Sequence, residues 1–171
     1  MNQAFLNDFD KIYKIMCDSF PNTEIRSYEG QKALFEKDAY RVFCMRENDE
    51  IVSIAAIWQF DDFTFVEHLA TTPNLRGKGI GASILREIIK TSPNIVCLEV
   101  EPPEDELTRR RIGFYERNGM NLNSYPYIQP SLGEGREAIP LLIMTSGTKI
   151  DTSTYNIIKS TLYKEVYNVI E

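Results

Sequence analysis

The chain has 171 residues, 43% of them hydrophobic and 26% charged, with neither an apolar run long enough to cross a membrane nor a signal peptide, so we expect a globular cytoplasmic protein outside the membrane. Its net charge of −6 argues against nucleic-acid binding, which depends on clustered Lys and Arg, and favours a cationic partner. Three scattered cysteines and one histidine favour neither a disulfide framework nor a metal site.

Two helices are expected at the front of the chain. Residues 8–20 place apolar side chains on one helical stripe, and Pro21 ends that helix. A polar stretch then leads to a second, shorter helix over residues 28–37.

An antiparallel meander is expected next. Residues 40–45, 51–60 and 63–70 are rich in β-branched and aromatic side chains. Polar residues at 47–50 and at 61–62 separate these runs and predict tight turns.

The second half of the chain alternates helices and strands. A glycine-rich segment opens a helix with a clear apolar stripe, which ends at Ser92 and Pro93. The elements expected after it are a buried strand over 95–100, a helix over 104–118, and strands near 121–129 and 137–144.

The tail of the chain predicts one more helix. Residues 152–170 place Tyr155, Ile158, Leu162 and Val166 on one face. The simplest organisation is therefore one α/β domain over residues 1–150 with a helical extension over 151–171. This extension would cover the domain core or form the contact of a homodimer.

The segment Arg76-Gly77-Lys78-Gly79-Ile80-Gly81 carries the strongest functional signal. It lies between a predicted strand and a predicted helix, where unpaired backbone N–H groups and the helix dipole attract phosphate. Glycines let the main chain approach phosphate oxygens closely, and the two basic side chains add charge.

Nucleotide-binding loops of other kinds compete with this interpretation. A Walker A loop is rejected, because Lys78 is followed by Gly79 and not by Ser or Thr. A Rossmann fingerprint would match Gly77, Gly79 and Ala82, with Glu99 at the end of the next strand. Against it, the glycines do not start at the strand end, and the preceding strands form an antiparallel meander.

Residues 68–81, HLATTPNLRGKGIG, resemble the acetyl-CoA-binding signature of the GNAT N-acetyltransferases. That signature is a strand, a Pro-containing loop and then Arg/Gln-x-x-Gly-x-Gly/Ala, and Arg76, Gly79 and Gly81 fill its three positions. The order of elements over about residues 5–146 is also similar to the family. The resemblance implies a GNAT fold, with a mixed, mostly antiparallel central sheet and helices on both faces.

The resemblance also implies a set of residues that bind acetyl-CoA, with no metal. Backbone groups of Leu69, Ala70 and Thr71 would contact the pantetheine arm and the acetyl carbonyl, where N–H groups stabilise a developing oxyanion. The pyrophosphate would be held by Arg76, Gly77, Lys78, Gly79, Ile80, Gly81 and Ala82.

A second motif supplies a candidate general acid. Residues 112–120, IGFYERNGM, resemble the family segment that ends in Tyr-Glu-Lys-x-Gly-Phe. Tyr115 matches its tyrosine, and a phenol with an ordinary pKa of about 10 can protonate the leaving thiolate. The sequence departs from the family at Thr108, where Asn is common, and at Arg111, where a small residue is usual.

Glu67 is the candidate general base. If side chains alternate along its strand, residues 65, 67 and 69 share one face, and Glu67 would face the acceptor beside Leu69. Glu99 and Glu101 are alternatives, whereas His68 is expected to point to the other face and to pack in the core.

We therefore expect an enzyme that transfers acetyl from acetyl-CoA to a primary amine by direct attack in a ternary complex. The acceptor is a small-molecule or peptide amine. The resemblance implies that the first two helices and the last hairpin recognise it, and their aromatic and acidic groups would suit an amine. The candidates in these segments are Phe20, Glu24, Arg26, Tyr28, Tyr125 and Tyr127. The alternatives are a CoA-binding sensor without turnover and a Rossmann-type dinucleotide protein. Cys97, in an apolar strand, is expected to be inert core.

Overall fold

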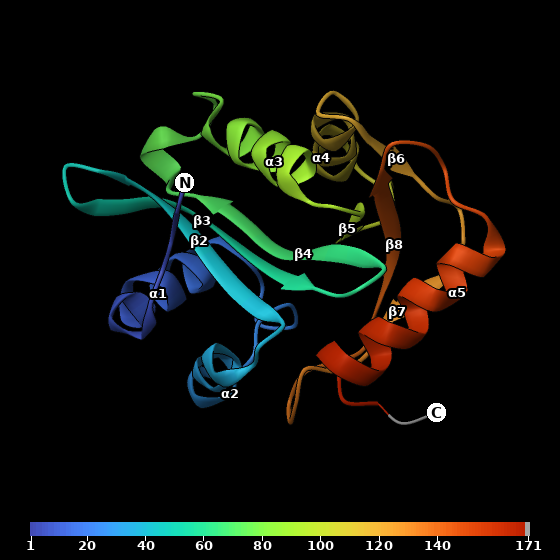
Figure 1. Ribbon diagram of the computed structural model, residues 1–171, viewed down its shortest axis with the longest axis horizontal. Coiled ribbons are helices and arrows are strands. Elements are labelled where there is room, and N and C mark those ends of the chain that lie inside the picture. Colours follow the sequence, from blue (N-terminus) through green and yellow to red (C-terminus); the bar gives the residue numbers. More distant parts are fainter. Residues whose placement is uncertain (170–171) are drawn as a thin grey trace. The chain divides into compact units, whose positions relative to one another are not determined.

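The computed structural model describes residues 1–169, which form both helices and strands (Figure 1). The chain divides into two compact units, Met1–Val96 and Cys97–Glu171.

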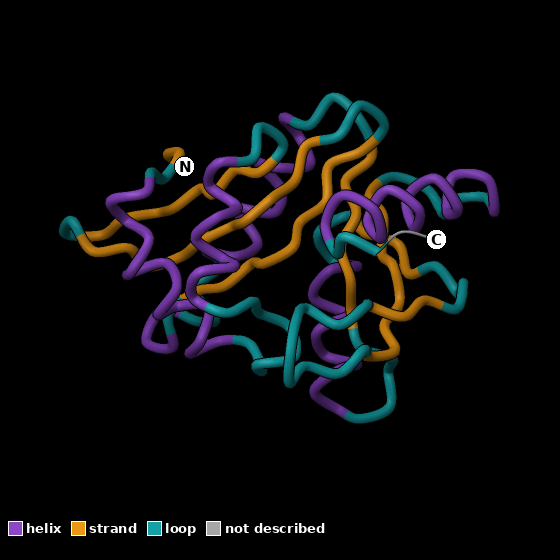
Figure 2. The backbone as a smooth tube through the Cα atoms, turned by 90° about the horizontal axis from the view of Figure 1, so that it is seen from below, coloured by secondary structure: helices purple, strands orange, loops and turns teal. Residues whose placement is uncertain are grey.

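The first unit contains an antiparallel sheet in the order β1-β2-β3-β4, whose strands are drawn in orange in Figure 2. Its strands are β1 (Asn2–Gln3), β2 (Tyr40–Glu47), β3 (Glu50–Gln59) and β4 (Phe63–Thr71). Every residue of β3 from Ile51 to Trp58 is buried, which requires that both faces of this strand are covered. The meander was predicted, whereas β1 was not.

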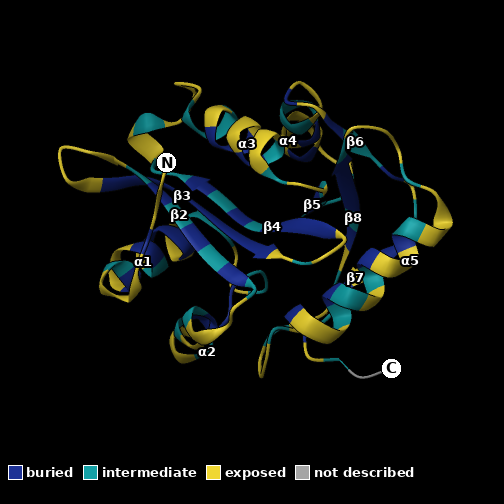
Figure 3. Ribbon diagram, in the orientation of Figure 1, coloured by how far each residue is buried: buried dark blue, intermediate teal, exposed yellow. Residues whose placement is uncertain are grey.

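Amphipathic helices cover this sheet. They are α1 (Phe9–Ser19), α2 (Tyr28–Ala33) and α3 (Ile80–Thr91), with short 3₁₀ turns η1 (Leu6–Asp8), η2 (Leu34–Glu36) and η3 (Pro73–Leu75). Both α1 and α3 pack against β3 and β4. Each has one buried and one exposed face, blue and yellow in Figure 3, as their apolar spacing predicts.

In the second unit, β8 is the central strand and pairs antiparallel with β5, β6 and β7. The division between the units falls within β5 (Ile95–Val100), which enters the second unit at Cys97. The elements after it are α4 (Glu106–Glu116), β6 (Met120–Leu122), β7 (Tyr127–Gln129), β8 (Ile139–Ser146), α5 (Thr152–Thr161) and the π-helix η4 (Leu162–Val166). The buried residues of β5 include Val96 and Leu98, as expected of its apolar sequence.

The strand expected over residues 121–129 is in fact two strands, β6 and β7. Asn123 lies between them, and its side chain donates to Thr145 Oγ1 at 2.9 Å and accepts from the Ile150 amide at 3.1 Å. Pro126 has no N–H to contribute to a ladder. A side chain that bonds to neighbouring segments therefore replaces regular strand pairing here.

The C-terminal extension belongs to the second unit. It is helical from Thr152, but the α-helix changes to a π-helix at Leu162 and ends at Val166, before the expected end. Ile170 lies outside the described residues. Tyr155, Ile158, Leu162 and Val166 are buried, so the predicted apolar face lies inside this unit. The division into residues 1–150 and 151–171 stays a prediction, as does a homodimer.

No helix within residues 1–169 is long and apolar enough to cross a membrane.

Candidate functional site

The glycine-rich loop ends in a left-handed turn at the start of α3. Gly77 has φ +78° and Gly79 has φ +81°, a region that residues with a Cβ rarely adopt. Gly79 is the N-cap of α3, and the first hydrogen bond of the helix runs from the Ser83 amide to the Gly79 carbonyl at 2.9 Å. The amides of Ile80, Gly81 and Ala82 precede that bond and form the open N-terminus of the helix.

The charge around this turn suits an anion. The first turn of α3 contains no acidic residue and no side chain caps it, whereas Asp105 caps α4 and Asp151 caps α5. Arg76 and Lys78 are both exposed beside the glycines. A pyrophosphate such as that of acetyl-CoA fits this arrangement of cations, amides and residues without a Cβ.

Arg76 also fixes the loop to its surroundings. Its Nε donates to the Thr71 carbonyl at 3.1 Å, and its Nη2 lies 3.5 Å from Ser19 Oγ at the end of α1. The arginine thus connects the loop with the last residue of β4 and with α1.

The predicted acetyl-binding segment forms the C-terminal end of β4. Leu69, Ala70 and Thr71 pair with residues of β3, and Ser53 Oγ donates to the Ala70 carbonyl at 2.7 Å. The structure therefore holds residues 69–71 and the glycine loop on consecutive segments of the first unit. Their contacts with a cosubstrate stay a prediction.

A β-bulge interrupts β4 immediately before this segment. Ala56 of β3 pairs with His68, but the next residue, Ile57, pairs with Val66, so that Glu67 is an extra residue. The prediction that residues 65, 67 and 69 share a face and that His68 points away from Glu67 was therefore wrong. It assumed strict alternation, which a bulge abolishes.

Glu67 and His68 both contact the segment between α1 and α2. Arg26 Nη1 donates to Glu67 Oε1 at 2.5 Å, and Trp58 Nε1 donates to Glu67 Oε2 at 3.0 Å. His68 Nε2 donates to the Glu24 carbonyl at 2.8 Å. The side chains of Arg26 and Glu67 are only 9% and 6% exposed, so this is a buried ion pair.

The protonation of this cluster follows from its burial and charges. Burial alone would raise the pKa of the Glu67 carboxyl, but Arg26, His68 and the Trp58 hydrogen bond together hold it below its ordinary value. Burial lowers the pKa of His68, although Glu67 partly opposes this. His68 is thus a packed neutral imidazole at neutral pH, which agrees with the expectation of a core histidine.

Tyr115 lies in the last turn of α4, in the second unit, and is partly exposed. The departures from the family motif have local partners. Thr108 forms a capping box with Asp105, whose carboxylate accepts from the Thr108 amide at 2.7 Å. Arg111 forms an exposed ion pair with Glu101.

A group of tyrosines surrounds Glu99 in the second unit. Tyr167 donates to Glu99 Oε2 at 2.7 Å, and Tyr127 also donates to this carboxylate. The sequence indicated Tyr127 as an acceptor-binding candidate but not Tyr167. The signal that could have found it is the run of tyrosines at 155, 163 and 167 along one tail.

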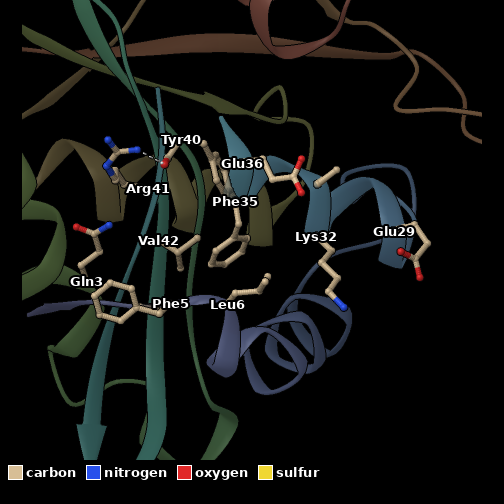
Figure 4. Close-up of a pocket in the computed structure, with 12 residues that line it drawn as sticks. Gln3, Phe5, Leu6, Glu29, Lys32, Phe35, Glu36, Tyr40, Arg41 and Val42 are labelled. Atoms are coloured by element: carbon tan, nitrogen blue, oxygen red, sulfur yellow. Dashed lines mark hydrogen bonds between the residues drawn. The ribbon is translucent and has the colours of Figure 1, made fainter. Parts of the chain in front are cut away.

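A separate pocket of about 510 Å³ lies in the first unit (Figure 4). Its walls come from η1, α2, η2 and β2, and Phe5, Leu6, Phe35 and Val42 contribute apolar side chains. None of the predicted catalytic or cosubstrate-binding residues lines it. Within residues 1–169, no group of three or more His, Cys, Asp or Glu side chains could hold a metal ion.

A family model for the acetyltransferase (GNAT) family matches residues 9–120, which is more than half of the chain. The chain belongs to this family. The match spans the glycine loop and the Tyr115 motif, so the resemblance on which these residues were chosen is confirmed. The Rossmann alternative is excluded, because β4, the strand before the glycines, pairs antiparallel with β3.

Similar proteins agree with this assignment. A candidate GNAT-family acetyltransferase from Bacteroides thetaiotaomicron is 30% identical, with a TM-score of 0.88 over 96% of this chain and 94% of that one. The candidate acetyltransferase YjbC of Bacillus subtilis (strain 168) is 31% identical over 61% of this chain. The match spans only 54% of that relative, about half its length.

Several fold neighbours are named for the acceptor that they acetylate. The ribosomal-protein-S18-alanine N-acetyltransferase of Escherichia coli has a TM-score of 0.62 at 20% identity, over 88% of this chain and 94% of that one. At this identity the likeness shows the GNAT fold alone. Together with the Bacteroides structure it confirms the predicted fold class.

Proposed function

We propose that this GNAT-family acetyltransferase transfers acetyl from acetyl-CoA to a primary amine by direct attack in a ternary complex. The observation that carries the proposal is the loop before α3. In a chain of this family, left-handed glycines, flanking cations and an uncapped helix N-terminus coincide within the segment that carries the signature.

Each segment of the loop and of β4 has a role in this proposal. The pyrophosphate lies against Arg76, Gly77, Lys78, Gly79, Ile80, Gly81 and Ala82. Backbone groups of Leu69, Ala70 and Thr71 orient the thioester, whose acetyl group is the one transferred. N–H groups that already point at the carbonyl stabilise the charge that develops on its oxygen.

Tyr115 is proposed as the acid that protonates the sulfur of the departing CoA, and the proton that the attacking amine loses passes to water. Glu67 was predicted as the base, but its carboxylate already accepts from Arg26 and Trp58, and its lowered pKa makes it a weak proton acceptor. We therefore propose that Glu67 acts through position, by fixing the bulge next to residues 69–71.

We prefer direct attack of the amine on acetyl-CoA to a mechanism with a covalent acetyl-enzyme intermediate. Cys97 is the cysteine nearest to the predicted site in sequence, but it is fully buried, and burial together with Glu99 raises the pKa of its thiol well above the ordinary value. A buried neutral thiol is a poor nucleophile.

The acceptor class rests on chemistry and on relatives. The acidic chain favours a cationic amine, and the E. coli fold neighbour is named for acetylating an alanine of a ribosomal protein. We propose a peptide amine or a small-molecule amine.

The test is release of CoA thiol from acetyl-CoA in the presence of a panel of amines, for the wild type and for Tyr115→Phe. We expect amine-dependent release that falls at least about a hundredfold in the variant, because general acid catalysis typically contributes that much. Binding of acetyl-CoA without release for any amine would favour a CoA-binding module. Failure to bind acetyl-CoA would contradict the proposal.

A further inference from the structure

Glu99 lies in a cluster of phenol groups from separate elements of the second unit. Tyr167 follows the π-helix η4, and its hydroxyl is 2.8 Å from Glu99 Oε1 and 2.7 Å from Glu99 Oε2. Tyr127 of β7 donates to Oε1. The ring of Tyr163 lies 5.9 Å from the ring of Tyr127, at 58° between the ring planes.

The cluster is built on buried side chains. Tyr127 is 3% exposed and Tyr167 is 7% exposed, whereas Glu99 is intermediate and so retains some contact with solvent. Two buried phenols thus hold the carboxylate of a residue that is itself partly exposed.

The Glu99 carboxylate acts electrostatically on the groups around it. Burial raises the pKa of the Tyr127 hydroxyl, and Glu99, Tyr167 and Tyr163 each raise it further. Glu99 also raises the pKa of Cys97.

We propose that Glu99, Tyr127 and Tyr167 form the subsite that first binds the acceptor amine as an ammonium, before that amine loses one proton to water and attacks. A primary ammonium has three N–H donors, and this cluster offers a carboxylate and two phenol oxygens within hydrogen-bond distance of one another. The electron-rich ring faces of tyrosines add attraction for a cation. This inference rests on the proposed function and names the residues that determine its acceptor specificity.

Other tyrosines of the same extension provide an internal comparison. Tyr155 donates to the Pro126 carbonyl and Tyr163 to the Ile128 carbonyl, both at 2.6 Å. These hydroxyls bond to the backbone and fix the extension beside β7. Tyr167 differs because its hydroxyl bonds to a carboxylate, so the extension contributes a polar group to the cluster in addition to its packing.

The experiment measures binding of amines to the full chain saturated with CoA, so that turnover is not needed. The probes are 1,4-diaminobutane and the tripeptide Ala-Ala-Ala, each titrated by NMR or calorimetry. The variants are Glu99→Gln and Tyr167→Phe, and Tyr155→Phe is the matched control, because it also loses one phenol hydrogen bond of the extension. The Kd of CoA is measured for each variant.

We expect Glu99→Gln and Tyr167→Phe to raise the Kd of at least one amine about tenfold or more, because a hydrogen bond to a charged group is lost. The Kd of CoA stays within about twofold, and Tyr155→Phe changes neither constant. The inference is overturned if neither amine binds the wild type, or if Glu99→Gln binds the amine as tightly as the wild type does. It is also overturned if Tyr155→Phe raises the Kd of the amine as much as Tyr167→Phe does. Amine binding without any thiol release would count against the proposed function and leave this subsite standing.

Discussion

Glu67 and His68 are consecutive residues of β4, yet both side chains contact the segment that connects α1 with α2. Glu67 binds Arg26, and His68 binds the Glu24 carbonyl. The bulge in β4 permits this, because its extra residue turns two neighbouring side chains toward the same segment. The end of β4, which is proposed to hold the acetyl group, is therefore connected by these contacts to the segment between α1 and α2.

Replacing only one partner of the buried ion pair between Arg26 and Glu67 should strongly destabilise the fold. We expect Arg26→Met to lower the free energy of unfolding by about 3–5 kcal/mol, because it leaves the Glu67 carboxylate buried without its cation. The double variant Arg26→Met/Glu67→Gln should recover a large part of this loss. Urea denaturation of the wild type, both single variants and the double variant measures the coupling.

The control for this cycle is Lys14→Met, which breaks the exposed i,i+4 pair with Asp18. Exposed pairs of this kind contribute little to stability, so this variant should unfold almost as the wild type does. Equal losses in Arg26→Met and Lys14→Met would contradict the account of a buried pair.

His68 should make stability depend on pH in the weakly acidic range. Its pKa is lowered in the folded chain by burial, so below its ordinary pKa of about 6.5 the unfolded chain takes up a proton that the folded chain does not. Stability is then lost as the pH falls from about 6.5 toward the folded pKa, at up to about 1.4 kcal/mol per pH unit.

The measurement is the free energy of unfolding at pH 7.5 and at pH 5.5, for the wild type and for His68→Gln. Glutamine retains an N–H donor for the Glu24 carbonyl but does not titrate. We expect a smaller difference between the two pH values in the variant. The lowered pKa of Glu67 acts at lower pH, because its contribution is lost only as that carboxylate is protonated. An equal pH difference in both proteins would refute the role of His68.

Gly79 should be required for cosubstrate binding and not merely for folding. Gly79→Ala places a Cβ at φ +81°, and Gly147→Ala does the same at φ +78°, with open space around both positions. Each substitution should cost about 1–2 kcal/mol of stability. Only Gly79→Ala should also weaken acetyl-CoA binding, by about tenfold or more, as measured by calorimetry. Equal affinities in the two variants would remove the loop from the proposed site.

Cys97 should be dispensable for turnover. We expect Cys97→Ala to retain its rate within about threefold and to lose about 1 kcal/mol of stability, as a small change in the core. Double-reciprocal plots of the initial rate, with both substrate concentrations varied, should give intersecting lines. Parallel lines together with an inactive Cys97→Ala would indicate an acetylated enzyme.

Local patterns in the sequence predicted most of the fold. The apolar stripes of α1 and α3 and the alternation of turns and β-rich runs in β2, β3 and β4 are properties of neighbouring residues. The break between β6 and β7 could not be predicted, because it depends on bonds from Asn123 to Thr145 and Ile150. Those partners are distant in sequence.

The candidate site could likewise be predicted only where it depends on residues that are neighbours in the sequence. The glycine loop is a local motif, so Gly77 and Gly79 could be selected from the sequence. The environment of Glu67 could not be, because one extra residue in β4 changes the direction of its side chain. The link between Tyr167 and Glu99 joins positions 68 residues apart, across a π-helix that no periodicity indicated.

The most direct test of the central claim is mass spectrometry of the amine after incubation with acetyl-CoA and the wild-type protein. The account predicts that at least one amine of a panel of peptides and small molecules gains one acetyl group, in an amount equal to the CoA thiol released, and only when the protein is present. Tight binding of acetyl-CoA with every amine of the panel left unmodified would contradict it.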